Sequence, residues 1–290
     1  MKKLILGTVQ MGLNYGVNNS LGKITLVESK NILKQSYLSG IDTLDTADGY
    51  GDAHNVIGEF HKDNPDLKFK VNTKLSHNIS YRDDIKSKCI EYINVLNVDS
   101  IEVLMFHSFE SYFNNRNCIS QLNELKDQGQ IKNIGVSVYT NDELKYLIEN
   151  EPFVTVIQLP FNLFDNNFIR GELLIQAKNN NKIIHTRSVF LQGLFFMNPS
   201  GQNKVLHYLK NELSLLNKIS TEENCSISDL ALSYCVKQKF IDKVIIGVDS
   251  TEQLLENIKS SSYLIKDEVV EIINKIQITK LDLLNPSKWD

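Results

Sequence analysis

Short apolar runs rich in β-branched residues recur eight times along this chain, and each is followed by a segment with helical spacing. The runs do not alternate with polar residues, which is typical of parallel strands buried on both faces. The expected strands are Leu4–Thr8, Ile41–Asp45, Phe69–Thr73, Ile101–Phe106, Asn133–Val138, Thr155–Leu159, Lys182–Val189 and Lys243–Val248. Eight such repeats in 290 residues predict an α/β fold of the closed (β/α)8 TIM-barrel type. An open doubly wound sheet is the alternative.

Helix start signals lie between the expected strands. Thr25 and Glu28 have the spacing of a capping box before a helix that ends near Gly40, and Thr140 and Glu143 repeat that spacing. The other expected helices are 80–96, capped by Ser80 and Asp83, then Ala53–His61, Cys118–Gln128, Ile169–Asn179, Ile227–Lys239 and Thr251–Ser261. An extra helix is expected near 202–218, before the last strand, and another in the C-terminal tail.

The composition excludes several classes of protein. Hydrophobic residues make up 42% of the chain, so it can bury a core, and we expect residues 1–290 to form one barrel domain. The net charge of −4 argues against nucleic acid as a partner. No apolar run reaches the roughly 20 residues that span a bilayer, and the N-terminus does not resemble a signal peptide. The four cysteines form no CxxC pair, so we expect reduced thiols and a cytoplasmic protein without a membrane partner.

Titratable residues follow three neighbouring strands. The second expected strand ends in Asp45, the third leads to Lys74 and the fourth to His107. Active sites of such barrels lie at the carboxyl ends of the strands. A carboxylate, an ammonium and an imidazole are therefore expected to converge there, with Tyr50 just above them.

Three motifs carry a family resemblance. The run Asp45–Gly51, DTADGYG, resembles the signature of the aldo-keto reductases, and Val71–Lys74 and Leu104–His107 resemble that family's next two blocks. The similarity extends from Gly7 to Asn257. It implies a (β/α)8 barrel that reduces aldehydes or ketones with a nicotinamide cofactor. The family's usual N-terminal hairpin is expected to be absent.

The four residues suit that chemistry. Reducing a carbonyl requires a hydride on carbon and a proton on oxygen, and Tyr50 is the candidate acid. A free tyrosine has a pKa of about 10. A nearby ammonium favours the phenolate, so Lys74 is expected to assist Tyr50 while Asp45 orients Lys74. His107 is expected to bind the substrate oxygen or the phenol. Alone, each residue could equally serve in an ion pair or in packing.

The resemblance also implies a cofactor site across the barrel mouth. Thr8 ends the first strand, and Ser137 and Gln158 take the positions that bind the nicotinamide carboxamide. Val138 replaces the family's usual Asn after that Ser, so one contact is lost, and Asn162 is expected to compensate in part.

The loop after the seventh strand resembles the pyrophosphate-side loop of the family. Its expected cofactor contacts are Ser188, Gln192 and Gly193. Arg187 stands where the family often has an aromatic residue stacked on the nicotinamide, and a guanidinium plane can stack as well.

The last block leads from the eighth strand into a helix N-terminus, which can bind phosphate through its free N–H groups. Ser250 is the expected N-cap, and Glu256 and Asn257 resemble the adenine contacts. The family often carries Lys or Arg here for a 2′-phosphate, but this chain has Gly247 and Gln253. NADP(H) is therefore expected over NAD(H) only because the family favours it.

Polar residues follow the first strand, where relatives with aromatic pockets place Trp. Gln10 and Tyr15, with Phe109 from the loop after His107, are the expected substrate contacts, and Asn14 and Asn18 lie in the same polar stretch. Because that loop is short, we expect an open site for a bulky or sugar-derived carbonyl. An ordinary polar turn and an unspecialised reductase remain alternatives.

Two other functions remain open. Some proteins of this fold act as cofactor-sensing subunits of larger assemblies, and a lyase could use Lys74 as a Schiff base. The expected partner is a small-molecule carbonyl, with no nucleic acid, and the expected state is a monomer or weak dimer. The remaining histidines show no metal-ligand spacing, so no metal is expected. Among them only His185 is expected to face a pocket.

Overall fold

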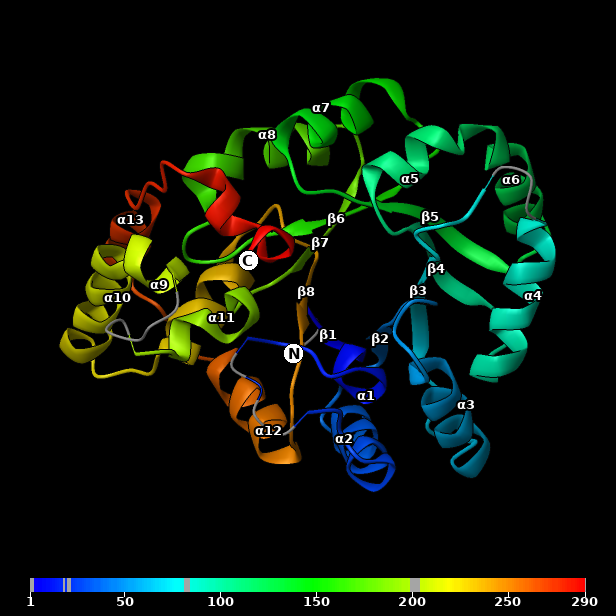
Figure 1. Ribbon diagram of the computed structural model, residues 1–290, viewed down its shortest axis with the longest axis horizontal. Coiled ribbons are helices and arrows are strands. Elements are labelled where there is room, and N and C mark those ends of the chain that lie inside the picture. Colours follow the sequence, from blue (N-terminus) through cyan, green and yellow to red (C-terminus); the bar gives the residue numbers. More distant parts are fainter. Residues whose placement is uncertain (1–2, 18, 20–21, 81–83, 199–203, 290) are drawn as a thin grey trace.

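Eight parallel strands close into a barrel in the order β1 to β8 in the computed structural model (Figure 1). The structure describes residues 3–17, 19, 22–80, 84–198 and 204–289. The strands are β1 Leu4–Gly7, β2 Thr43–Asp45, β3 Lys70–Leu75, β4 Ile101–Phe106, β5 Ile131–Ser137, β6 Val156–Pro160, β7 Ile183–Arg187 and β8 Lys243–Ile246. The predicted barrel, and its eight strands in order, are confirmed.

Helices surround the strands (Figure 1). The barrel helices are α2 Leu26–Leu38, α3 Ala53–Asp63, α4 Ile85–Leu96, α6 Ile119–Asp127, α7 Asn141–Asn150, α8 Asn167–Asn179, α11 Ile227–Lys237 and α12 Thr251–Ser260. The additional ones are α1 Val9–Gly12, α5 Phe109–Asn114, α9 Lys204–Tyr208, α10 Lys210–Glu222, α13 Asp267–Asn274, and the 3₁₀ turns Arg116–Cys118, Leu191–Phe196, Leu281–Leu284 and Pro286–Lys288. In the described parts of the chain, no helix is long and apolar enough to cross a membrane.

Several predicted boundaries differ from the structure. The helix expected near 202–218 is two helices, α9 and α10, and its first residues lie outside the described part. The loop expected after His107 is mostly helical, because Ser108 caps α5 by accepting a hydrogen bond from Ser111 N. Asp84 caps α4 in place of Ser80, while Asp83 lies outside the described residues.

The two predicted capping boxes have different outcomes. Thr140 accepts from Glu143 N while the Glu143 carboxylate accepts from the Thr140 N–H, so this box is confirmed. Thr25 also caps its helix by accepting from Glu28 N. The Glu28 carboxylate, however, accepts from Thr251 at the start of α12. A long-range contact has replaced the local one.

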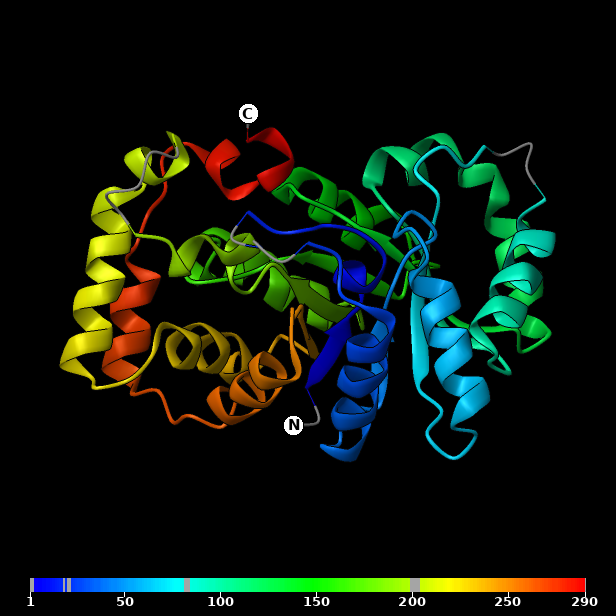
Figure 2. The same cartoon turned by 60° about the horizontal axis from the view of Figure 1, so that its bottom comes forward.

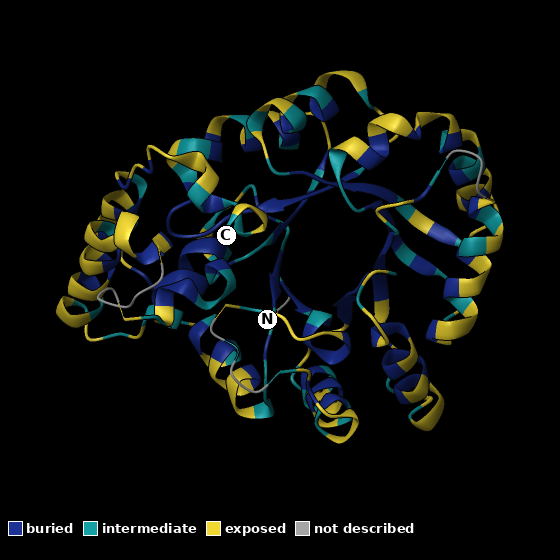
Figure 3. Ribbon diagram, in the orientation of Figure 1, coloured by how far each residue is buried: buried dark blue, intermediate teal, exposed yellow. Residues whose placement is uncertain are grey.

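The main core lies between the strands and the helices, and exposed residues line the outer helix faces (Figure 3). Inside the barrel, Val103, Met105 and Val156 form a small apolar cluster. Gly135 makes room for them, since a β-carbon there would lie 2.8 Å from Met105 Cγ. The barrel interior is therefore filled by side chains, which confines a ligand to its ends.

The C-terminal tail packs on the end of the barrel where the strands finish. Asn166, which precedes α8, donates through its side-chain amide to the carbonyls of Ile273 and Ile276 and so holds α13 in place. Figure 2 shows the red C-terminal segment on the same side as α1, which follows the end of β1. Trp289 donates to the Leu283 carbonyl at 3.1 Å, which closes the last turn of the tail.

Candidate active site

A buried ion pair lies at the carboxyl ends of β2 and β3. Lys74 Nζ is 2.5 Å from Asp45 Oδ1, and the two side chains are 1% and 5% exposed. The strand register pairs Asp45 with Asn72, so Lys74 follows two residues further along β3 on the same face. Gln158 from β6 donates to the second carboxylate oxygen of Asp45 at 2.7 Å. Three strands therefore hold this carboxylate.

The surroundings of Lys74 keep it charged. Burial by itself lowers the pKa of Lys74, but Asp45 and Tyr50 more than offset that, and the pKa lies above its usual value. Lys74 also donates to the Thr46 carbonyl at 3.0 Å. Its Nζ lies 5.2 Å from the centre of the Tyr50 ring. A fixed ammonium therefore stands beside the tyrosine.

His107 also lies beside Tyr50. The two rings meet edge to face, with centres 5.7 Å apart. Burial lowers the pKa of His107 to about 2, and the nearby Lys74 adds to this effect. The imidazole is therefore neutral at ordinary pH, and its buried Nδ1 has no protein partner among the described residues. A neutral imidazole can donate one hydrogen bond to a substrate oxygen.

Two glycines fix the loop that carries Tyr50. Gly12 at the end of α1 lies against this loop so closely that a methyl group on it would overlap the Tyr50 carbonyl oxygen. Gly51 has φ +54° and lies equally close to Gly12, since a β-carbon would be 2.5 Å from the Gly12 carbonyl oxygen. The first and second strand ends are thereby locked together.

The loop after β7 has a strained backbone. Ser188, Leu191 and Gln192 have φ values of 60°, 48° and 55°, a region that non-glycine residues rarely adopt, and Gly193 follows at 89°. Such strain gathers at ligand sites. The loop predicted to contact the cofactor therefore has a feature of a binding loop, although nothing in its composition except Gly193 indicates it.

The Arg187 guanidinium lies over an aromatic ring. Its guanidinium carbon is 4.1 Å from the centre of the Tyr139 ring, and its Nη2 donates to the Val138 carbonyl at 3.3 Å. The Asn162 side chain is buried and bonded to the Ser188 carbonyl and the Phe164 amide, so both of its polar atoms already have protein partners. Its expected role in replacing a lost cofactor contact stays a prediction.

Two predicted contacts meet across the mouth. Gln192 donates to the Tyr15 hydroxyl at 2.8 Å, which links the β7 loop to the β1 loop. Gln10 lies over Gly247, where a β-carbon would be 2.7 Å from its Nε2. Gln10 Oε1 is buried and has no partner among the described residues. Buried polar atoms are normally hydrogen-bonded, so this acceptor is available to a ligand or to water.

Three other predicted cofactor residues already have hydrogen-bond partners within the protein. Thr8 is buried and donates to the Asp45 carbonyl. Ser137 ends β5 in register with Gln158, whose amide nitrogen is taken by Asp45. Ser250 caps α12 as predicted by accepting from Gln253 N.

Other predicted residues lie further from the ion pair. Glu256 is exposed on α12, while the adjacent Asn257 is buried. Phe109 packs in an aromatic cluster with Tyr146, their ring centres 5.4 Å apart, and makes no ring contact with Tyr50 or His107 among the described residues. Asn18 lies outside the described residues.

Sequence reasoning missed three neighbours of this site. His77, in the loop after β3, stacks on His107 with ring centres 3.9 Å apart. Tyr139 supports Arg187. Inside the barrel, Asn72 is fully buried and both of its side-chain polar atoms lack partners in the described part of the chain. The position of Asn72 two residues before Lys74 was the only available signal for any of them.

The fold and the site place the chain in the class of (β/α)8 barrels whose polar groups converge at the carboxyl ends of the strands. The Aldo/keto reductase family model matches residues 3–278, and the chain belongs to that family. A curated NADH-specific methylglyoxal reductase of Escherichia coli (strain K12) is 24% identical, covering 92% of each chain. D-arabinose 1-dehydrogenase of Saccharomyces cerevisiae is 24% identical over 86% of this chain and 82% of its own. A solved aldo-keto reductase from Bacillus halodurans, in its holo form, superposes with a TM-score of 0.77 at 18% identity, covering 95% of this chain and 92% of its own.

Proposed function

We propose that residues 1–290 act as one barrel unit that reduces an aldehyde or ketone to an alcohol with a reduced nicotinamide cofactor. The observation that carries this proposal is the buried Lys74–Asp45 pair beside Tyr50. A buried ion pair gives little net stability. Its position next to a tyrosine and a neutral histidine supports a role in proton transfer.

Each side chain has a separate task in this proposal. Tyr50 donates the proton to the carbonyl oxygen, and a bound nicotinamide cofactor would supply the hydride to the carbon. Lys74 stabilises the phenolate that remains, and Asp45 holds the Lys74 ammonium in place. His107 donates a hydrogen bond to the same oxygen before and during the transfer.

The described residues fit a nicotinamide cofactor. Gln10 Oε1, which lies over Gly247, has no partner among the described residues, and the loop at Ser188 and Gln192 has the strained backbone of a binding loop. Arg187 presents a flat guanidinium backed by Tyr139. The cofactor would supply the hydride. The preference for NADP(H) expected from the family stays a prediction.

The proposed substrate is a polyhydroxylated or sugar-derived carbonyl. A cleft of about 540 Å³ opens beside His77 and is lined mainly by polar side chains, among them Asn78, Ser108 and Asn114. Side chains of this kind can hydrogen-bond the hydroxyl groups of a substrate. The named activities of the relatives, on methylglyoxal and D-arabinose, support a small polar carbonyl.

The test combines binding with turnover. Purified protein is titrated with NADH and NADPH while the nucleotide fluorescence is followed, and oxidation of the bound nucleotide is then recorded with short aldoses, keto sugars and methylglyoxal. Nucleotide binding together with carbonyl-dependent oxidation supports the proposal. If neither nucleotide binds, the proposal is wrong.

A further inference from the structure

The start of α12 carries a carboxylate from another helix. Glu28 of α2 accepts through Oε1 from the Thr251 backbone amide at 2.7 Å and from the Thr251 hydroxyl at 2.8 Å. These two residues are 223 positions apart in the chain. Phosphate groups in (β/α)8 barrels frequently bind at the loops after the seventh and eighth strands and at the adjoining helix N-terminus. Here a protein carboxylate occupies part of that position.

The neighbouring backbone donors also have acceptors. Gln253 N donates to Ser250 Oγ at 3.2 Å, and Asp249 N donates to Gln253 Oε1 at 2.8 Å. The Gln253 side chain is therefore engaged within its own turn. A dianionic phosphate at this point would have to displace these bonds.

The local charge is negative. Asp249, Glu252 and Glu256 lie in the sequence around the start of α12, and Glu28 adds a fourth carboxyl group. In the described part of the chain none of the four forms an ion pair with Lys or Arg. The bond from the Thr251 amide holds the pKa of Glu28 below its usual value, so that this carboxylate stays ionised at neutral pH.

We infer that Glu28 is a specificity-determining residue that makes this enzyme select NAD(H) over NADP(H). This inference rests on the proposed function, because it assumes that a nicotinamide cofactor lies across the mouth with its adenosine end at α12. The adenosine of NAD(H) ends in a neutral 2′-hydroxyl, whereas that of NADP(H) carries a 2′-phosphate. Juxtaposed like charges oppose binding strongly, and a carboxylate accepts a hydrogen bond from a hydroxyl. The preference expected from the family is therefore reversed in this chain.

The test measures equilibrium binding and does not depend on turnover. Dissociation constants of NADH and NADPH are measured by fluorescence titration for the wild type, for Glu28→Gln and for the control Glu252→Gln. Glu252 is exposed and follows Thr251 in the first turn of α12. Among the described residues it makes no hydrogen bond to Thr251. Adenosine 5′-monophosphate and adenosine 2′,5′-bisphosphate, titrated by calorimetry, isolate the contribution of the 2′-phosphate. Thermal melting shows whether Glu28→Gln still folds.

We expect wild-type protein to bind NADH at least about 10-fold more tightly than NADPH. Glu28→Gln should reduce that ratio several-fold by improving NADPH binding, and Glu252→Gln should change it less than twofold. Tighter binding of NADPH by the wild type, or an unchanged ratio in a folded Glu28→Gln variant, would overturn the inference while leaving the proposed function intact. If Glu28→Gln does not fold, the test is made with wild-type protein alone by comparing its affinities for adenosine 5′-monophosphate and adenosine 2′,5′-bisphosphate. Equal affinities would overturn the inference. Failure of both dinucleotides to bind would instead contradict the proposed function.

Discussion

The Lys74 ammonium and the Asp45 carboxylate lie 2.5 Å apart inside the barrel mouth, where almost no solvent reaches either side chain. The desolvation of two charges opposes such a pair, and its mutual attraction offsets this only when the remaining polar atoms are also bonded. Thr46 and Gln158 supply those bonds. A pair built in this way is better explained by its effect on Tyr50 than by stability.

Replacing Tyr50 by Phe should remove the proton donor and leave the cofactor site intact. General acid–base groups contribute about 10²–10⁴-fold, so turnover should fall by that factor. The dissociation constant of the cofactor should change less than twofold. Steady-state kinetics and fluorescence titration check the two parts. Wild-type turnover on every carbonyl tested would contradict the assignment.

Replacing Lys74 by Met should move alcohol oxidation to more alkaline pH, because the phenolate loses its ammonium neighbour. Asp45→Asn should cause a smaller shift in the same direction, since Lys74 remains but is less well held. Both variants leave a polar group buried without its partner, so their melting temperatures should fall.

The control for this pair is an exposed ion pair on the same strand. Lys70 at the start of β3 pairs with Asp42 at 2.9 Å, and both side chains are more than half exposed. Lys70→Met should therefore leave the pH–rate profile unchanged. If the pH–rate profiles of Lys74→Met, Lys70→Met and the wild type coincide, the proposed coupling between Lys74 and Tyr50 is ruled out.

Replacing Gly12 by Ala should impair catalysis without altering any reacting group. The new methyl group would overlap the Tyr50 carbonyl oxygen and displace the loop. A misplacement of this kind can lower the rate about 100-fold. Gly49→Ala is the matched control in that loop, since its β-carbon would have no atom within 4 Å. Equal values of kcat/KM for the two variants would show that the close approach of Gly12 has no role.

Acid should destabilise the protein through its buried histidines. Burial lowers the pKa of His54 and of His185 to about 4, against about 6.5 in the unfolded chain. Between pH 6.5 and 4 the unfolded state therefore binds protons that the native state does not. The free energy of unfolding should fall by about 1.4 kcal/mol per pH unit for each histidine as the pH drops, and no such loss is expected above pH 6.5.

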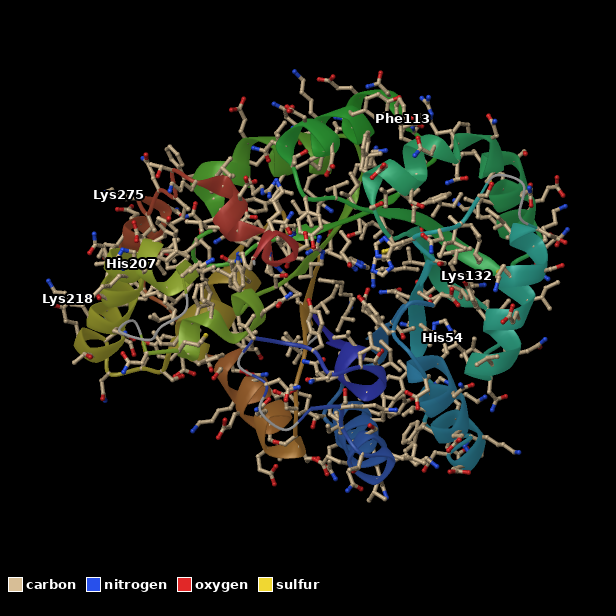
Figure 4. All side chains as sticks on the ribbon, in the orientation of Figure 1. His54, Phe113, Lys132, His207, Lys218 and Lys275 are labelled. Carbon is tan, nitrogen blue, oxygen red and sulfur yellow. The ribbon has the colours of Figure 1, made fainter. Side chains whose placement is uncertain are left out.

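Urea unfolding at several pH values measures this slope. His54 Nε2 is hydrogen-bonded to Thr73 Oγ1 at 2.8 Å. A Gln side chain can partly replace this bond. His54→Gln should reduce the slope by about 1.4 kcal/mol per pH unit. His207 is exposed on α9 at the outer rim of the molecule (Figure 4), and His207→Gln should leave the slope unaltered. A wild-type stability that does not vary between pH 6.5 and 4.5 would contradict the prediction.

Sugar-derived carbonyls should be preferred over flat aromatic aldehydes. A site built to bond hydroxyls disfavours an analogue that lacks them, because its buried polar groups are left unpaired. Values of kcat/KM for a short aldose and for 4-nitrobenzaldehyde are compared in the wild type and in a chain ending before Trp289, the residue that closes the tail. A strong preference for nitrobenzaldehyde that disappears on truncation would make the tail the specificity element and exclude the polar site.

The eight apolar runs predicted parallel strands buried on both faces, and the number of repeats in 290 residues favoured a closed barrel over an open doubly wound sheet. The motifs around Asp45, Tyr50, Lys74 and His107 likewise predicted which residues share the mouth, since parallel strands all end on the same side. The Thr140–Glu143 capping box was also predicted, because both of its hydrogen bonds join residues that are close in the sequence.

Contacts between distant segments were decided only by the tertiary structure. Glu28 has the spacing of a local cap, yet its carboxylate bonds Thr251, because closing the barrel brings α2 and α12, the first and last of the barrel helices, side by side. The stack of His77 on His107 and the bond from Asn162 to the Ser188 carbonyl depend on how loops from different strands meet. Local sequence determines the backbone of each repeat, whereas the partner of a polar side chain depends on which groups barrel closure places within hydrogen-bond distance.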